Sequence, residues 1–437
     1  MPRTPGSLLP RSGLRLHRAW LVAAVTVLAL VSAEVFRSTT GALFEPIETE
    51  FGWGRAQVSG AVTANLIIYG VVAPFAAVLL ERFRPSRVAA AALLLIAAGS
   101  GLTTVMGSLW QLWVLWGGFV GVGAGALALV FGAVVANRWF THRRGLVMGI
   151  FSAAGACGQL AFLPVIVNMA ERHGWRTASL LVAAFALAII PLLFWPFADS
   201  PASVGITPHG SDQTAPPAQH AGTEPAARRK NAALETFGVL REAIRHRAFW
   251  ILALTFAVCG WTTNGLVQTH FLPATHDHGM PAGTAAGMLA LIGIFDVIGT
   301  IASGWLTDRV SPWVLLVGYY SMRGVSLLTV HTVLGPSAEP PLWIFIIFYG
   351  LDWVATVPPT VALCRTYFGP RLATPVFGWV FAAHMIGAGA GAFAAGLLRE
   401  SYGSYMIAWF TAAALCFLAS VAMFFLPPAP SRSKAEG

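Results

Sequence analysis

The sequence predicts an all-α integral membrane protein, and three observations support this fold class. Hydrophobic residues make up 56% and charged residues only 10% of the 437 positions, whereas a soluble domain carries about 25% charged residues. The mean hydropathy is +0.69. Apolar runs of about 20 residues, the length that spans a bilayer as a helix, recur along the chain between turn and charge signals.

Twelve such runs are predicted to be transmembrane helices from their length, apolar content and flanking residues. Their ranges are 19–44, 57–80, 88–107, 110–137, 145–169, 176–198, 248–272, 283–306, 313–335, 341–368, 374–398 and 403–426. The first run follows Arg11, Arg15 and Arg18 and contains Val31-Ser32-Ala33, which resembles a secretory signal and its cleavage site. Because the run continues to Phe44, we expect it to be retained.

The loops between the runs differ in charge, which predicts the orientation of the chain, because cytoplasmic loops carry an excess of Lys and Arg. The side of both termini holds Arg82, Arg84, Arg87, Arg138, Arg143, Arg144, Arg228, Arg229, Lys230, Arg241, Arg245, Arg247, Arg365 and Arg371. The opposite loops hold Arg55, Arg172, Arg176 and Arg399. Both termini are therefore expected in the cytoplasm, with the protein in the inner cell membrane. The net charge of +9 reports this topology, and we expect no nucleic-acid partner.

A stretch rich in Pro, Gly, Ser, Thr and Ala, residues 199–231, separates the sixth and seventh runs and is typical of a flexible linker. After it, an apolar stripe at helical spacing with arginines between its members predicts a short amphipathic helix on the membrane surface. The stripe is Leu234, Phe237, Leu240 and Ile244. The expected division is an N-terminal six-helix bundle (1–198), a linker with the amphipathic helix (199–247) and a C-terminal six-helix bundle (248–437).

The two halves carry matching motifs at a nearly constant offset. Leu80-Glu81-Arg82-Phe83 and Thr307-Asp308-Arg309-Val310 are 227 residues apart, and Trp139-Phe140 and Tyr367-Phe368 are 228 apart. Offsets that agree at corresponding points of a six-helix unit indicate internal duplication.

Twelve helices, a central linker and these acidic–arginine pairs resemble the major facilitator superfamily. The superfamily's loop pattern is fairly well kept in Gly304-Trp305-Leu306-Thr307-Asp308-Arg309. The segment from Trp139 to Gly149 is similar to a signature of the monocarboxylate porter and oxalate/formate-type families. The resemblance implies two pseudo-symmetric bundles with helices 1, 2, 4, 5, 7, 8, 10 and 11 around a central cavity. It also implies that Arg37-Ser38 fills the family's cationic position on helix 1.

Ionisable residues lie near the middle of several runs, at the level where transporters place substrate and coupling-ion sites. An ionised side chain at that depth costs roughly 2.5–3.5 kcal/mol on insertion scales, so such residues usually face a cavity or a partner. They are Glu34, Arg37, Asp296, Arg323, Asp352 and His384.

Arg37 is the first candidate for a ligand anchor, because it stays charged at physiological pH and suits an anion. The alternative is an internal ion pair, and Glu34, one turn earlier, is its nearest counter-charge. Arg323 lies on a helix that the resemblance places outside the cavity, so we expect it to neutralise Asp296 or Asp352. These two carboxylates are also the candidates for proton coupling.

A substrate pocket is predicted from the repeat and from helical spacing. The 227-residue offset relates Arg37 to Asn264 and Tyr69 to Asp296, which are expected to face one another across the pseudo-two-fold axis. The predicted pocket consists of Arg37, Tyr69, Asn264, Gln268, Asp296 and His384, walled by Trp261, Phe377 and Phe381. The alternative is helix packing or lipid contact for the aromatic residues and a structural hydrogen bond for His384.

Other motifs indicate structure rather than chemistry. Pro358-Pro359 predicts a break or bend in the tenth helix that frees carbonyl groups. The glycine clusters lie within apolar runs and predict close helix packing, not nucleotide loops. The loop His276-Asp277-His278 has no further ligand cluster, so we expect no metal, no cofactor and no catalytic residues. The cysteines, at positions 157, 259, 364 and 416, are expected to be free.

The sequence thus predicts a secondary transporter, not an enzyme, that moves a small organic anion by proton symport and alternating access. Its expected partners are the anion, protons and the lipid bilayer, and the functional unit is expected to be a monomer. Glu81-Arg82 and Asp308-Arg309 are expected to form gating contacts at the cytoplasmic end. The alternative is proton-coupled efflux of amphipathic drugs or organic cations, which Asp296, Asp352 and Glu34 would receive.

Overall fold

The computed structural model of the protein describes residues 18–127, 129–141, 144–210 and 232–428. Within these ranges, the description leaves out the side chains at positions 38–39, 77–78, 81–82, 129–130, 144–146, 148–149, 152–153, 155–157, 159–160, 232–233, 235 and 370–371. Most described residues lie in helices, and the single β-bridge in this part of the chain joins Phe140 to His209. The predicted all-α membrane fold is confirmed.

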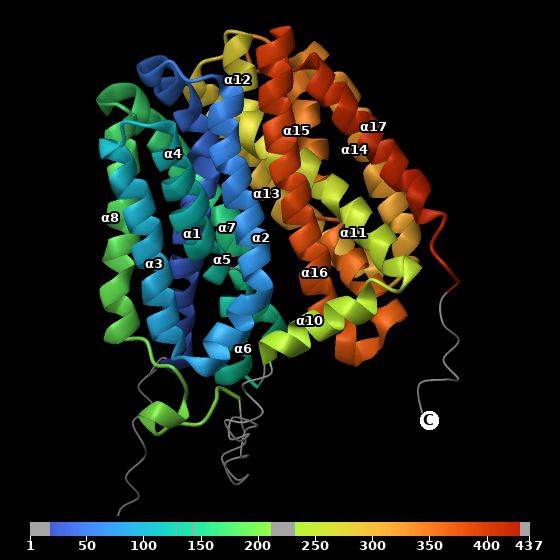
Figure 1. Ribbon diagram of the computed structural model, residues 1–437. Coiled ribbons are helices and arrows are strands. Elements are labelled where there is room, and N and C mark those ends of the chain that lie inside the picture. The colour runs from blue at the N-terminus through green and yellow to red at the C-terminus, as the bar shows by residue number, and fades with distance from the viewer. Residues whose placement is uncertain (1–17, 128, 142–143, 211–231, 429–437) are drawn as a thin grey trace, which may run out of the picture.

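The described part of the N-terminal half forms six crossings, coloured blue to green in Figure 1. They are α1 (Arg18–Phe51), α2 (Arg55–Arg82), α3 (Pro85–Leu102), a fourth crossing made of α4 (Leu109–Leu112), η2 (Trp113–Val120), α5 (Gly121–Ala126) and α6 (Leu129–Trp139), then α7 (Arg144–His173) and α8 (Trp175–Phe194). Two short helices lie in loops, η1 (Thr103–Val105) and η3 (Ala202–Val204).

The C-terminal half, coloured yellow to red in Figure 1, also forms six crossings within residues 232–428. The first crossing consists of α11 (Arg247–Gly260), η4 (Trp261–Val267) and α12 (Gln268–Asp277). The next two are α13 (Ala282–Thr307) and α14 (Pro312–Val333). The fourth is α15 (Pro340–Asp352) with the first part of α16 (Val357–Tyr402), the fifth is the rest of α16, and the sixth is α17 (Met406–Met423). The chain reverses within α16 at Gly369, whose φ of 72° lies in the left-handed region, where glycine is favoured.

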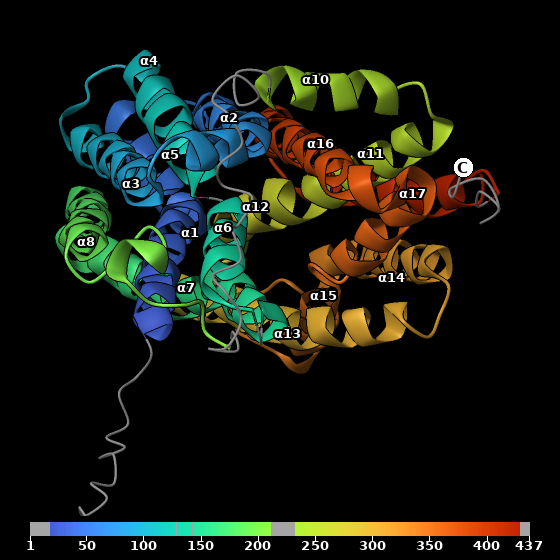
Figure 2. The same ribbon diagram turned by 90° about the horizontal axis from the view of Figure 1, so that it is seen from below.

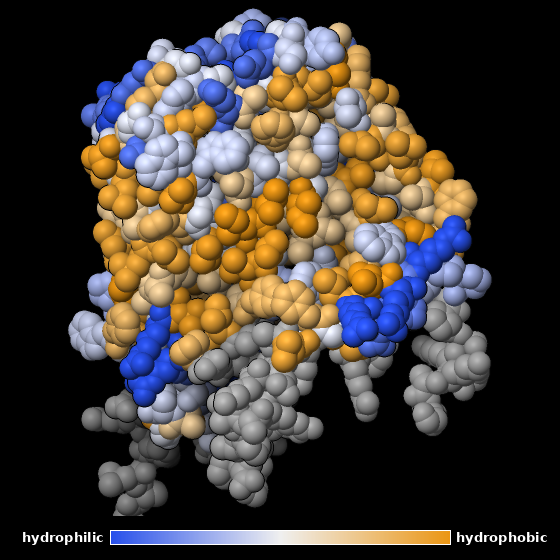
Figure 3. Space-filling view, viewed as in Figure 1, coloured by the Kyte–Doolittle hydropathy of each residue, from blue (hydrophilic) through white to orange (hydrophobic). Residues whose placement is uncertain are grey.

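Eleven helices among the described residues are long and apolar enough to cross a membrane, and α7 occupies the place of the predicted fifth helix. Hydrophobic residues cover the middle of the face in Figure 3, and hydrophilic residues gather above and below them. Two element boundaries differ from the prediction. α1 continues to Phe51 instead of ending near Phe44, because the polar residues after Phe44 remain helical and find partners on neighbouring helices. The tenth crossing breaks between Asp352 and Val357, as the prolines predict.

The two ends of the molecule differ. At the end called here the linker end, α1 begins and α17 ends, and α10 (Ala232–Ala243) lies across the bundle, roughly perpendicular to the other helices (Figure 1). At the opposite, far end, α1 ends and α2 begins. α10 joins both halves, because the Phe237 ring lies 5.3 Å from Phe75 on α2 and 5.9 Å from Trp379 on α16.

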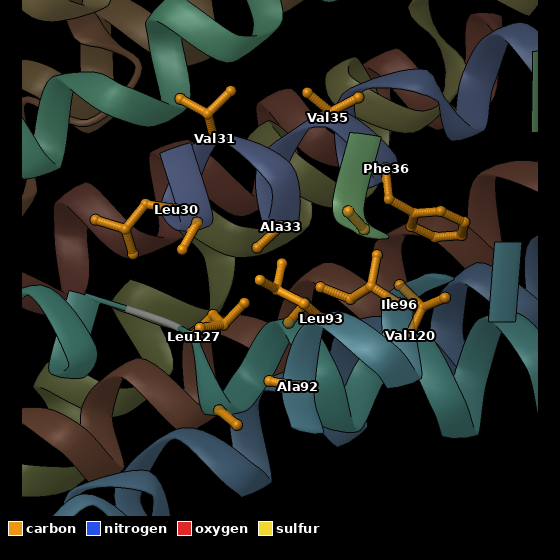
Figure 4. Packing of buried hydrophobic residues seen from close by; sticks show 14 of the residues in the cluster. Leu30, Val31, Ala33, Val35, Phe36, Ala92, Leu93, Ile96, Val120 and Leu127 are labelled. Atoms are coloured by element: carbon orange, nitrogen blue, oxygen red, sulfur yellow. The ribbon is translucent and has the colours of Figure 1, made fainter. Parts of the chain in front are cut away.

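The halves meet along three helix pairs, α1 with α12, α2 with α16 and α7 with α13, which lie side by side in Figure 2. Glycines bring these helices into contact: Gly41 lies against the Thr269 carbonyl, and Gly70 against Met385. Thr63 Oγ1 also donates to the Gly389 carbonyl across the interface, at 2.9 Å. Behind α1, apolar side chains of α3 and the fourth crossing form the core of the N-terminal half (Figure 4). This core positions the middle of α1 against the C-terminal half.

Candidate functional site

Arg37 lies near the middle of α1, where the two halves meet. Its side chain is only 8% exposed. Nη1 donates to both carboxylate oxygens of Glu34, at 2.9 Å and 3.2 Å, as the three-residue spacing on one helix allows. The guanidinium carbon lies 4.5 Å from the ring centre of Tyr69 on α2, a cation–π contact. These two neighbours hold the charge of Arg37 in one place.

A small cavity beside Arg37 is lined by residues of both halves. Its volume is about 10 Å³, which is enough for roughly one water molecule. The lining residues are Arg37, Thr40, Val62, Asn65, Leu66, Asn264, Gln268 and Thr269. Asn264 belongs to η4, a π-helical segment, and such segments are frequent at functional sites. In the described state, the halves are therefore closed around Arg37.

Two buried donors in this lining have no acceptor. Arg37 Nε and Gln268 Nε2 lack a hydrogen-bond partner within the described residues. Leaving a buried donor unpaired costs about 1–3 kcal/mol, and more for a charged group. A third polar residue, Asn65, is occupied, because its Nδ2 donates to the Trp116 carbonyl at 2.6 Å. The two unpaired donors make the cavity suitable for a group with acceptor oxygens and negative charge.

His384 on α16 connects the cavity to the C-terminal half. Its Nδ1 lies 3.1 Å from the Phe256 carbonyl oxygen and its Nε2 lies 3.2 Å from Asn264 Oδ1. Because a carbonyl only accepts, Nδ1 carries a proton. A neutral ring then needs the Asn264 amide turned so that its nitrogen donates to Nε2, whereas a charged ring donates to both groups. In either form, His384 orients a residue of the cavity lining.

Aromatic rings continue from His384 toward the linker end. Phe381 stacks on His384 at 5.7 Å and 7° between planes, and it lies 6.2 Å from Tyr69 across the interface. Phe377 follows at 6.5 Å from Phe381. Trp261 does not join this row, because it packs with the apolar core of the C-terminal half. The structure thus brings together most of the predicted pocket, and it leaves out Trp261 and Asp296.

Asp296 lies on α13 and does not line the cavity around Arg37. Its Oδ1 accepts hydrogen bonds from Thr300 Oγ1 at 3.1 Å and from the backbone N–H of Val354 at 3.0 Å. The expected pairing of Asp296 with Tyr69 across the pseudo-two-fold axis is therefore wrong. The physical reason is that the break after α15 offers Asp296 the free N–H group of Val354. The carboxylate therefore turns toward α15 and away from the cavity beside Arg37.

Arg323 and Asp352 form a buried ion pair between α14 and α15. The Arg323 side chain is 0% exposed, and its Nε donates to Asp352 Oδ2 at 2.5 Å. Nη2 donates to the carbonyl oxygens of Asp352 and Trp353, and Nη1 donates to Cys259 Sγ and Thr262 Oγ1. Each of the five N–H groups of the guanidinium thus has an acceptor. Of the two carboxylates expected from the sequence, Arg323 binds Asp352.

The acidic–arginine motifs at the linker end are described in one copy only. The side chains of Glu81 and Arg82 lie outside the described residues. In the other copy, Arg309 turns onto Trp305, with its guanidinium carbon 4.1 Å from the ring centre, and Nη1 donates to the Trp305 carbonyl. Asp308 ends α13, and no ion pair in the described part of the chain joins it to Arg309. The gating role of these four residues stays a prediction.

The far end carries a polar network that the sequence did not predict. Arg55 on α2 pairs with Glu48 of α1 at 2.6 Å and donates to Tyr405 Oη at 2.9 Å. His270 Nε2 donates to the Ala392 carbonyl at 2.8 Å, so its Nδ1 accepts from the Tyr405 hydroxyl at 3.1 Å. This network links the two halves. Its only signal in the sequence is Arg55, one of few basic residues expected on that side.

Three comparisons relate the chain to known proteins. A family model described as Major Facilitator Superfamily matches residues 26–392. The chain is 23% identical over 421 residues to the uncharacterised transporter YcxA of Bacillus subtilis, covering 95% of this chain and 97% of that protein. It is 27% identical over 399 residues to monocarboxylate transporter 13 of Bos taurus, covering 89% and 84%. The crystal structure of a D-xylose–proton symporter has the same fold, with a TM-score of 0.72 and 13% identity over 94% of this chain and 99% of that one.

Proposed function

The chain belongs to the Major Facilitator Superfamily, and from this premise we propose that it carries a small organic anion, a monocarboxylate or related carboxylate, together with protons. That it is a transporter and not an enzyme follows from the family and from relatives named as transporters. The substrate class and the proton coupling are the proposal. The name of the monocarboxylate transporter among the relatives supports the carboxylate class.

The observation that carries the substrate class concerns two donors of the cavity lining, Arg37 Nε and Gln268 Nε2, which have no hydrogen-bond partner among the described residues. A carboxylate supplies acceptor oxygens and the charge that favours short, strong hydrogen bonds with a guanidinium. Glu34 occupies Nη1 of Arg37, whereas Nε has no hydrogen-bond partner among the described residues. Glu34 therefore acts as a holder of Arg37, and the substrate takes the remaining side.

Binding requires the two halves to separate, because the cavity of about 10 Å³ is smaller than any carboxylic acid. In the proposed cycle, the far end opens first, a proton and the anion bind, and the far end closes into the described state. The linker end then opens and releases both. Such rocking of two halves around a central site is alternating access.

We assign the coupling proton to Asp296 rather than to Asp352. Asp352 faces the buried charge of Arg323, which it neutralises, and a proton on Asp352 would leave that cation unpaired. Asp296 has no ion-pair partner among the described residues, and its side chain is only partly buried. A proton can therefore bind to Asp296 without exposing an opposite charge.

We propose that both termini face the cytoplasm and that the protein lies in the inner cell membrane. Basic residues are concentrated in the loops of the linker end, which the positive-inside rule assigns to the cytoplasm. A monomer is sufficient for the proposed function, since residues of one chain line the cavity on both sides.

Counterflow of radiolabelled monocarboxylates into proteoliposomes tests the anchor role of Arg37. Replacing Arg37→Gln removes a hydrogen-bonded charge worth about 1.5–3 kcal/mol, so kcat/KM should fall by roughly ten- to one-hundredfold. Arg37→Lys keeps the charge and loses the fork of donors, and it should retain part of the activity. The matched control is Arg87→Gln, at an exposed arginine of the linker end, which should transport normally.

Competition in the same assay tests the substrate class. Carboxylates should inhibit uptake and amines should not, because the unpaired groups of the cavity are donors. Undiminished counterflow in Arg37→Gln would refute the anchor role. Inhibition by amines alone would favour the alternative, efflux of an organic cation.

A further inference from the structure

The break between α15 and α16 is bound by side chains of neighbouring helices. α15 ends at Asp352 and α16 begins at Val357, and backbone groups at a helix end lack helical partners. From α14, Arg323 donates to the carbonyl oxygens of Asp352 and Trp353. From α11, Cys259 Sγ lies 3.2 Å from Thr356 Oγ1. Both contacts hold the side of the break that faces α11 and α14.

α13 holds the break from the other side with two hydrogen bonds. Asp296 Oδ1 accepts from the Val354 N–H at 3.0 Å, and Ser303 Oγ donates to the Ala355 carbonyl at 2.5 Å. The two helices can approach so closely because Gly299 of α13 lies directly against the Leu351 backbone, where an added methyl group would collide with its carbonyl. The break is therefore a fixed structure with a partner on each side.

Among these contacts, only that of Asp296 has a charge that proton uptake can remove without leaving an unpaired ion. Arg323 stays charged at physiological pH, Asp352 neutralises it, and Ser303 carries no charge. Arg323 and Cys259 are the charged or titratable groups that act on Asp296. Within the described residues, no hydrogen bond or ion pair joins Asp296 to a charged group of α7, α12 or α16.

We propose that Asp296 is a proton-operated clasp on this break: the charged carboxylate holds the Val354 N–H, and proton uptake at Asp296 releases the start of α16. A hydrogen bond to an ionised acceptor is roughly twice as strong as one to a neutral acceptor. When a proton binds to Oδ2, Oδ1 becomes a neutral carbonyl oxygen that Thr300 and Val354 share. The clasp then weakens, while the bonds of Arg323 and Ser303 remain.

The released segment is connected to the anion cavity. Thr356 contacts Cys259, and Cys259 lies five residues before Asn264, which lines the cavity. A shift at the break therefore reaches the cavity through α11 and η4. The clasp gives Asp296 a positioning role at a distance, although Asp296 itself does not contact the anion site. This inference rests on the proposed proton coupling and is independent of the identity of the anion.

Hydrogen–deuterium exchange of the purified full-length protein, without substrate, tests the clasp. Peptides that cover residues 350–360 are followed between about pH 5 and pH 9, after correction for the intrinsic pH dependence of exchange. In the wild type, acidification should raise the corrected exchange by about tenfold, the difference between a charged and a neutral hydrogen bond. In Asp296→Asn, which keeps the acceptor and lacks the charge, exchange should be fast at every pH.

Ser303→Ala is the matched control, because it removes a contact to the same break that carries no charge. It should raise exchange at every pH and keep the acid step. The absence of an acid step in the wild type would overturn the proposal, and so would the same step in Asp296→Asn. If Asp296→Asn does not fold, the wild-type series and Ser303→Ala still show whether exchange at the break rises on acidification. If the wild type shows the acid-induced rise in exchange but does not transport carboxylates, the proposed substrate is refuted. The proposal for Asp296 is then unaffected.

Discussion

At the scale of single residues, two arginines within the membrane-spanning helices differ in how many of their N–H groups have hydrogen-bond partners. Arg323 has an acceptor for each N–H group and a carboxylate beside it, so its charge is fully neutralised inside the C-terminal half. Arg37 lines a cavity, and its Nε has no partner in the described part of the chain. The first arrangement stabilises a buried charge for structure, and the second leaves a donor for a ligand. The number of unpaired donors, and not the presence of the charge, separates the two roles.

The buried pair predicts strong destabilisation when one partner is removed. Arg323→Met or Asp352→Leu alone should lower the free energy of unfolding by about 3–5 kcal/mol, because each leaves the other charge unpaired. The double variant should lose clearly less than the sum, since no charge remains. Thermal unfolding in detergent measures all three. Arg309→Met, at an exposed arginine, should change little. A double variant as unstable as the sum would contradict the assigned pairing.

At the scale of elements, backbone contacts between helices decide where the site residues lie. α11 and α16 touch at Gly260, where a side chain would collide with the His384 carbonyl, and at Gly387, where it would collide with the Ala257 carbonyl. His384 therefore reaches Asn264 only because glycines let the two helices approach. These contacts confirm the prediction from the sequence that glycines of the run from Gly387 to Gly396 serve close helix packing.

Substituting the glycine at this contact should separate α11 from α16. Gly260→Ala forces the backbones apart and should cost about 1–3 kcal/mol of stability, as overpacking usually does. Transport should fall as well, because His384 would move away from Asn264. The matched control is Gly318→Ala on α14, where the added methyl group meets open space and should be neutral or stabilising by about 0.5–1 kcal/mol. Equal thermal stability and transport in both variants would contradict this packing argument.

At the scale of the whole molecule, the described state is held closed at the far end by the network of Arg55, Glu48, Tyr405 and His270. Tyr405 lies between two membrane-spanning segments, and burial raises its pKa to about 12. Its hydroxyl therefore stays protonated at physiological pH and can donate to His270 while it accepts from Arg55. A second contact supports the closure, because Glu400 of α16 accepts from the Ala56 N–H of α2 at 3.0 Å.

Removing the Tyr405 hydroxyl should shift the population toward a state open at the far end. Tyr405→Phe deletes a hydrogen bond to a charged group, worth about 1.5–3 kcal/mol, so the open population should rise by about tenfold or more. The distance between the halves is measured by double electron–electron resonance spectroscopy. Spin labels are placed at exposed Thr49 and Ser404, in a variant that lacks the native cysteines. Tyr402→Phe, at a tyrosine 65% exposed, is the matched control. A distance distribution unchanged in Tyr405→Phe would show that this hydroxyl does not hold the far end closed.

The sequence by itself determined the helices, their number and their two-fold organisation. It also singled out Arg37 and His384, because ionisable residues are rare within apolar runs that cross a lipid bilayer. Asn264 and Gln268 followed from the repeat offset and helical spacing. It overlooked Asn65 of the cavity lining, although this residue lies one turn before Tyr69 on the same helix face.

Only the tertiary structure decided that Arg323 binds Asp352 and that Asp296 turns to the helix break. It also decided that Arg37 and Gln268 keep donors without a partner among the residues that the structure describes. The physical reason is that hydropathy sets where a helix crosses the membrane, whereas its rotation and depth depend on contacts between residues far apart in the chain. A pseudo-two-fold offset aligns positions along the helices and leaves the direction of each side chain to its local partners. For Asp296, that partner is the Val354 N–H, freed where α15 ends.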